Sequence, residues 1–202
     1  MAENAANLDH AISEQNWIDR AAEPVQRAIA PIINKSPVVA SVLHGEWLGH
    51  PLHAALTDIP VGAWSTGFVF DLTEKFTGTR RLRRAADAAI VVGLVSAMGA
   101  AVAGMADWSK TRGQERRLGF VHASTNMVIA GLYGASIYAR RTRKRTLGVA
   151  LSSVGFGLLL FSAWLGGELS YRHGVGMRKE AFQRNREDVD YLADLEFMRT
   201  QP

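Results

Sequence analysis

The sequence predicts an all-α integral membrane protein: a four-helix bundle with an amphipathic helical segment before it and a polar tail after it. Three observations support this fold class. Four apolar stretches reach the roughly 20 residues that a helix needs to cross a bilayer. Strongly basic loops separate them. Apolar residues before the first stretch recur at helical spacing. The expected spans cover residues 52–72, 85–106, 120–139 and 147–167.

The spans define three regions of the chain. Residues 1–43 form an N-terminal helical tail in which Trp17, Ile18 and Val25 share a face. This tail lies either on the outer membrane surface or across the end of the bundle. Pro24 and Pro31 are expected to break it into short pieces. Residues 44–177 form the transmembrane domain, and residues 178–202 form a mixed-charge tail available to a partner.

Basic residues predict the orientation of the bundle. The loops after the first and third spans are the most basic, so we expect both in the cytoplasm. Both termini then lie on the outer side, in the periplasm of a bacterium with an inner membrane. The loop between the second and third spans is also basic, which weakens the bias. The residues are Lys75, Arg80, Arg81, Arg83 and Arg84 in the first loop, Lys110, Arg112, Arg116 and Arg117 in the second, and Arg140, Arg141, Arg143, Lys144 and Arg145 in the third.

Composition excludes several classes of function. The chain has no cysteine, which removes disulfides, thiolate metal sites and cysteine-ligated iron–sulfur clusters. Its isoelectric point of about 9.7 reflects topology and contact with lipid headgroups, because the positive charges flank the spans. We therefore expect no nucleic-acid partner. The sequence has no nucleotide-binding glycine loop, no secretory signal and no evident internal repeat.

Histidines gather at the end of the bundle that is expected to face outward, here called the mouth. Five of the six histidines lie at span ends on that side, and other polar residues join them. The histidines are His44, His50, His53, His122 and His173. The other polar residues are Asp58, Asp107, Asn126, Glu168 and Tyr171.

Three interpretations of these histidines stay open. A b-type haem needs two imidazoles on opposing helices, and His53 with His122 is the best pair, with His50 as a substitute for His53. Asn126 lies one turn below His122, and Tyr171 would help to close the mouth. A quinone would use the same histidines as hydrogen-bond partners.

The second interpretation is a non-haem metal ion held by His50, His53 and His122 with Asp58, a ligand set that suits zinc, iron or copper. The third is structural: the histidines cap helices and bond across the bundle without a ligand.

A longer motif resembles a known family. The segment from His44 to Trp64, with Asp107-Trp108, His122 and the glycine-rich segment 166–176, resembles the bacterial membrane family "domain of unknown function 2231" over about residues 8–180. Members are often fused to, or encoded beside, Rieske iron–sulfur domains. The resemblance implies a four-span protein with redox neighbours. A Rieske cluster needs cysteine ligands, so an iron–sulfur protein would be a separate partner.

These observations lead to two hypotheses. The first is a redox module of the bacterial inner membrane with haem or quinone at the mouth. The alternative is a non-catalytic accessory subunit of a membrane complex. We favour an electron carrier or accessory subunit over a stand-alone enzyme, because no nucleophile–base pair is evident. The expected partners are the lipid bilayer, a membrane or periplasmic protein such as a Rieske-type protein, and a second copy of this chain.

Overall fold

The computed structural model describes residues 9–177, and all the regular structure in that part of the chain is helical. Residues 9–13 form a helical turn and Asn16–Ile18 a 3₁₀ turn, η1. Helices α2 (Asp19–Asn34) and α3 (Pro37–Leu43) follow. The predicted all-α class is confirmed. The C-terminal tail at 178–202 lies outside the described residues.

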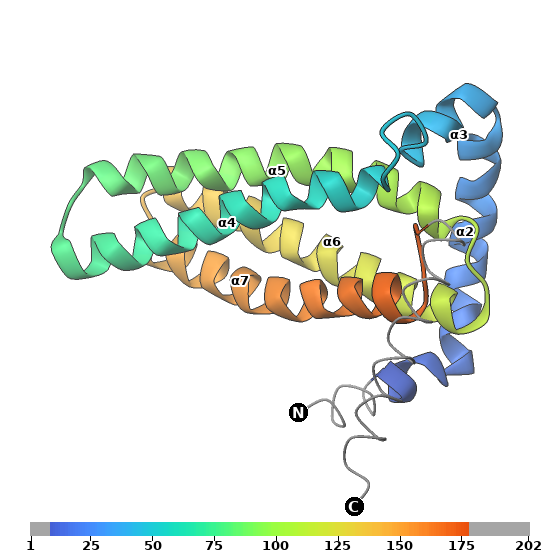
Figure 1. The fold of residues 1–202 in the computed structure, drawn as a ribbon. Coiled ribbons are helices and arrows are strands. Elements are labelled where there is room, and N and C mark those ends of the chain that lie inside the picture. Colours follow the sequence, from blue (N-terminus) through green and yellow to red (C-terminus); the bar gives the residue numbers. More distant parts are fainter. Residues whose placement is uncertain (1–8, 178–202) are drawn as a thin grey trace, which may run out of the picture.

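Four long helices make up the rest of the described chain (Figure 1). They are α4 (Leu52–Thr77, 26 residues), α5 (Arg81–Trp108, 28 residues), α6 (Gly113–Arg141, 29 residues) and α7 (Arg145–Gly167, 23 residues). Each contains one predicted span. A π-helical segment, η2 (Glu168–Arg172), continues α7. In the described part of the chain, α5 and α7 with η2 are long and apolar enough to cross a membrane.

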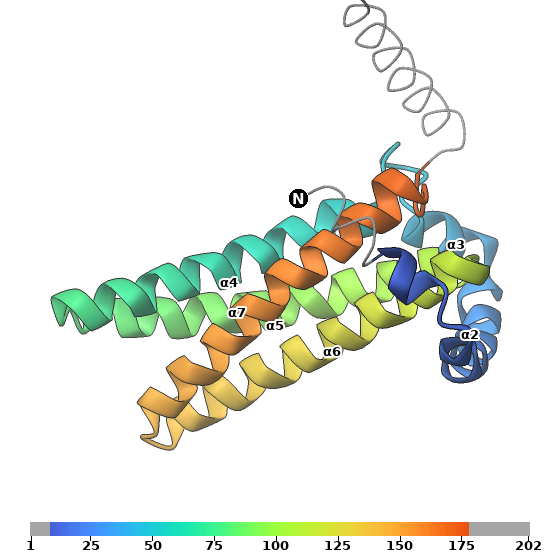
Figure 2. The same ribbon diagram turned by 90° about the horizontal axis from the view of Figure 1, so that it is seen from below.

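The four helices form two hairpins. Pairing is closest between α4 and α5 and between α6 and α7. Both hairpin turns lie at the end of the bundle far from α2, here called the loop end (Figures 1 and 2). The first turn is tight because Gly78 caps α4 with φ +68°. Since both hairpins run in the same direction, an axis along the bundle relates them.

The two hairpins repeat the same internal contacts. In the first, Trp64 packs on Gly93, and in the second Tyr133 packs on Gly155. His53 and Trp64 are separated by the same number of residues as His122 and Tyr133. The spacing from Gly93 to Gly104 likewise equals the spacing from Gly155 to Gly166. The prediction that the chain has no internal repeat is therefore wrong.

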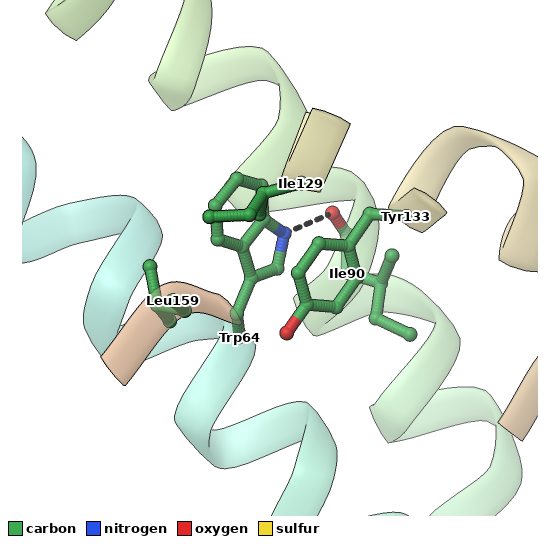
Figure 3. Close-up of a cluster of buried hydrophobic side chains, with 5 residues drawn as sticks. All are labelled: Trp64, Ile90, Ile129, Tyr133 and Leu159. Atoms are coloured by element: carbon green, nitrogen blue, oxygen red, sulfur yellow. Dashed lines mark hydrogen bonds between the residues drawn. The ribbon is translucent and has the colours of Figure 1, made fainter. Parts of the chain in front are cut away.

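Corresponding residues of the two hairpins meet on the axis. Midway along the bundle the rings of Trp64 and Tyr133 stack, with centroids 4.3 Å apart and planes 9° from parallel. Trp64 Nε1 donates to the carbonyl of Ile90 at 3.3 Å. Ile90, Ile129 and Leu159 complete this buried cluster (Figure 3). The cluster joins all four helices into one core.

A buried ion pair joins the hairpins near the loop end. Arg140 of α6 binds Asp71 of α4 through both terminal guanidinium nitrogens, and the two side chains are only 2% and 3% exposed. Arg140 also donates to Asp87 at 2.8 Å and to Ser152 at 2.9 Å. Arg145 adds a second cation, with 2.9 Å to Asp71 and 3.1 Å to Asp87.

The N-terminal segment packs across the mouth. Ile18 and Ala22 are buried against Trp108 at the end of α5. Trp17 is 64% exposed on the outer side of this segment. The helix-on-bundle alternative is therefore confirmed. The expectation that prolines break the segment is wrong, because Pro24 and Pro31 both lie inside α2 on its exposed side. Tertiary packing keeps the helix intact despite the lost hydrogen bonds.

We expect Asp71→Asn to destabilise the protein by about 3–5 kcal/mol, because it leaves Arg140 buried without its main counter-charge. Denaturant unfolding in detergent micelles measures this. Arg83→Gln is the matched control, since Arg83 pairs with Glu74 but is 44% exposed, and its loss should cost less than about 1 kcal/mol. Similar small losses in both variants would contradict a structural role for the buried pair.

Candidate functional site

Two histidines from corresponding positions of the hairpins face each other at the mouth. His53 lies in the first turn of α4, and His122 lies near the start of α6. Their ring centroids are 6.3 Å apart, and the ring planes are nearly perpendicular, at 89°. The structure thus brings together the pair that the sequence analysis selected for haem.

Each histidine is oriented by the second helix of its own hairpin. His53 Nδ1 lies 2.8 Å from the carbonyl oxygen of Ala100, and His122 Nδ1 lies 3.1 Å from that of Ser162. A carbonyl oxygen only accepts, so Nδ1 carries the proton in both rings. The other ring nitrogen, Nε2, is therefore not used by these two bonds.

Two glycines make room for the rings. A methyl group on Gly104 would lie 2.8 Å from His53 Nδ1, and one on Gly166 would lie 3.3 Å from His122 Cε1. Any larger residue at Gly104 would push the His53 ring from its place. The sequence alone did not connect either glycine to a histidine ring.

Asn126 distinguishes the two histidines. Its amide nitrogen lies 3.1 Å from His122 Nε2, 3.0 Å from the His122 carbonyl oxygen and 2.8 Å from Ser162 Oγ. Thr57 holds the corresponding place below His53, and its hydroxyl donates to the carbonyl of Ala54 instead. In the described part of the chain, no side chain donates to His53 Nε2.

A second polar pair lies beside the histidines. His44 Nδ1 and Asp107 Oδ1 are 2.9 Å apart, and both side chains are largely buried. Burial raises the pKa of Asp107, while the hydrogen bond to His44 opposes the rise. His44 Nε2 is buried without a partner among the described residues.

Other predicted site residues lie apart from this pair. His50 and Asp58 are exposed, and His50 precedes the helix because Pro51 is the N-cap of α4. In the described residues, no three His, Cys, Asp or Glu side chains are grouped to hold a metal ion. The proposed set of His50, His53, His122 and Asp58 is therefore not assembled, and metal binding stays a prediction.

The last three predicted mouth residues follow α7. The π-helical turn directs Tyr171 outward, where it is 72% exposed. Glu168 lies 3.4 Å from Arg172. His173 Nε2 lies 3.3 Å from Asp9, which ties the end of η2 to the N-terminal segment. These contacts close the side of the mouth but do not reach the histidine pair.

Sequence reasoning missed the ion network at the loop end. We expected arginines there to fix only topology, yet Arg140 and Arg145 bind buried Asp71 and half-buried Asp87. The signal was an acidic residue in two successive apolar helices, since ionisable groups inside a membrane segment need partners.

These features define an all-helical predicted membrane protein with two related hairpins and a histidine pair at one end. The model of the family described as "Predicted membrane protein (DUF2231)" matches residues 49–179, and the chain belongs to that family. The match contains all four long helices and both His53 and His122. No curated protein and no solved structure matches the chain.

Glycine substitutions test the mouth geometry. We expect Gly104→Ala to destabilise the protein by about 1–3 kcal/mol, because the new methyl group overlaps the His53 ring. Gly99→Ala is the matched control on the same helix, since no atom lies within 4 Å of its added methyl group. It should be neutral or slightly stabilising. Thermal unfolding in detergent compares them, and equal midpoints would contradict the close contact.

Asp19 makes the packing of α2 dependent on pH. Burial alone would raise its pKa, but hydrogen bonds and charge from Arg117 and Arg116 lower the pKa below its ordinary value. A lowered pKa in the folded state stabilises docking above the unfolded pKa, and this is lost as pH falls through the folded value.

We expect amide hydrogen exchange in α2 to accelerate at acidic pH relative to α6, after correction for the intrinsic rate. Asp19→Asn should raise α2 exchange at neutral pH, whereas Asp58→Asn should not, because Asp58 is exposed and lies in α4. An α2 that stays equally protected in Asp19→Asn would contradict this role.

Proposed function

We propose that the protein is an electron-carrying module of the bacterial inner membrane that binds a b-type haem between His53 and His122. The observation that carries the proposal is the approach of two imidazoles, one from each hairpin, at corresponding positions. An axis relating two halves of a protein presents paired ligands from two sides. His53 and His122 would hold a haem iron from these two sides.

The two rings that would hold the group lie close together, with centroids 6.3 Å apart. Each Nδ1–H is held by a carbonyl, as is usual for ligating histidines, which leaves Nε2 for the metal.

Asn126 would have to release His122 Nε2 on binding. Its amide keeps acceptors at Ser162 Oγ and at the His122 carbonyl, so neither hydrogen is left without a partner. Two imidazole nitrogens would then be available to the proposed haem.

The number of protein ligands favours haem over a bare metal ion. Zinc and non-haem iron sites use three or more protein side chains. Two imidazoles meet here, and among the described residues no group of three His, Cys, Asp or Glu side chains is arranged to hold a metal ion. A haem supplies four nitrogen ligands from its own ring and needs only two more. Bound haem would supply one-electron transfer.

The proposal includes four membrane crossings. All four long helices exceed the roughly 20 residues required. The ionisable groups Asp71, Asp87 and Arg140 pair inside the bundle, while Val69, Val95 and Val154 are exposed along it. Such a surface suits lipid.

The number of basic side chains supports the proposed orientation. The loop between α5 and α6, at the mouth, has four basic residues: Lys110, Arg112, Arg116 and Arg117. The loop end presents many more exposed basic side chains without a carboxylate partner in the described chain. They are Lys75, Arg80, Arg81, Arg84, Arg141, Arg143 and Lys144. By the positive-inside rule, the loop end faces the cytoplasm and the mouth faces the periplasm. The mouth would then exchange electrons with a periplasmic partner.

The visible spectrum of the detergent-purified protein, expressed with ample haem, tests the proposal. We expect a Soret band, with sharp α and β bands after reduction, that is lost in both His53→Ala and His122→Ala. His50→Ala is the matched control, because His50 is exposed, and it should keep the spectrum. A colourless protein would overturn the haem proposal and favour an accessory subunit, or a quinone at the same histidines.

A further inference from the structure

The side of the bundle between α5 and α6 is hollowed near the loop end. The groove has a volume of about 410 Å³, within the range of small-molecule sites. Its wall is apolar at Val91, Val92 and Ile137, and Arg140 and Arg141 lie toward the loop end. In a membrane this groove opens sideways into the acyl chains of one leaflet.

The equivalent side of the bundle, between α4 and α7, is filled. There the rings of Phe68 and Phe156 stack with centroids 4.4 Å apart. On the hollow side, Ile137 corresponds to Phe68, because each lies one helical turn after a ring of the central stack, Tyr133 or Trp64. Leu94 corresponds to Phe156, because each comes directly after a glycine, Gly93 or Gly155. At these two corresponding positions the hollow side thus carries smaller side chains than the filled side.

The hollow side differs in charge as well as in volume. Arg141 on the hollow side corresponds to Leu72 on the filled side, because Arg140 and Asp71, which directly precede them, occupy corresponding positions. Arg84 lies one turn before Ala88 on the groove face of α5, and both Arg84 and Arg141 are exposed. Neither forms an ion pair within the described chain, because the nearby Asp87 binds Arg140 and Arg145.

We propose that this groove binds one acidic phospholipid. Its phosphate would lie between Arg84 and Arg141, and one acyl chain would lie against Val91, Val92 and Ile137. Two unpaired guanidinium groups above an apolar groove match an anion joined to a hydrocarbon chain. The inference rests on the membrane placement proposed above and does not depend on haem.

Native mass spectrometry of the full chain in detergent, titrated with dioleoyl phosphatidylglycerol or dioleoyl phosphatidylcholine, tests this site. We expect one phosphatidylglycerol to bind in preference to phosphatidylcholine. Arg84→Gln with Arg141→Gln should weaken phosphatidylglycerol binding about tenfold or more. The matched control, Arg80→Gln with Arg143→Gln, removes equal charge from exposed positions at the same end and should retain binding within about twofold.

A second pair of substitutions tests the groove itself. Leu94→Phe with Ile137→Phe copies the filled face and should weaken phosphatidylglycerol binding while keeping both arginines. Equal loss in the two arginine double variants, or equal binding of both lipids, would overturn the proposal. Unchanged binding in the filled variant, or displacement by glycerol phosphate alone, would overturn the acyl-chain site. The haem spectrum should be unchanged in all these variants, which separates this test from that of the proposed function.

Discussion

The ion pair of Asp71 and Arg140 constrains the whole bundle. Moving either charge out of water costs several kcal/mol, so the pair is tolerated only where close partners surround its charged atoms. Ser136 accepts from Arg140 Nε at 3.0 Å and donates to the carbonyl of Gly148 at 2.6 Å. A methyl group on Gly148 would lie 2.6 Å from the Arg140 side chain, so only glycine permits this approach. The register between the hairpins is therefore fixed at the loop end.

From that fixed point, pairs of corresponding residues continue along the axis. The Trp64–Tyr133 stack lies in the middle, and the His53–His122 pair lies at the mouth. The three pairs use different interactions. Asp71 and Arg140 form an ion pair, Trp64 and Tyr133 stack, and the rings of His53 and His122 are each held by a backbone carbonyl. A shift of one hairpin along the other would disrupt all three at once. The distant ion pair thus helps to hold the two imidazoles at their separation.

The sequence predicted the coarse architecture because that depends on local properties. Span length and apolar composition located the four long helices, and histidines at span ends indicated His53 and His122. The repeat escaped notice because its halves conserve contacts more than residue types: Trp64 corresponds to Tyr133, and Asp71 corresponds to Arg140, an opposite charge. Pairing across the axis requires complementary rather than identical residues, so a search for self-similarity misses it.

Residues near helix ends were the least predictable. Helix α4 begins at Leu52 with Pro51 as its N-cap, so His50 lies outside the helix and is exposed. At the end of α7, a π-helical turn alters the direction of the side chains, so Tyr171 is exposed. Hydrophobic periodicity carries no information on such turns, because backbone hydrogen bonds decide them.

The departures from symmetry are where function is best sought. If the symmetric arrangement only stabilised the fold, equivalent residues on both sides of the axis would be sufficient. Instead, Asn126 engages His122 Nε2, while Thr57 at the corresponding place donates to Ala54, and no side chain in the described part of the chain donates to His53 Nε2. In the proposed haem complex, the iron would reach His53 without displacing a side chain. It would reach His122 only when Asn126 released Nε2, while Asn126 kept its bonds to Ser162 and to the His122 carbonyl.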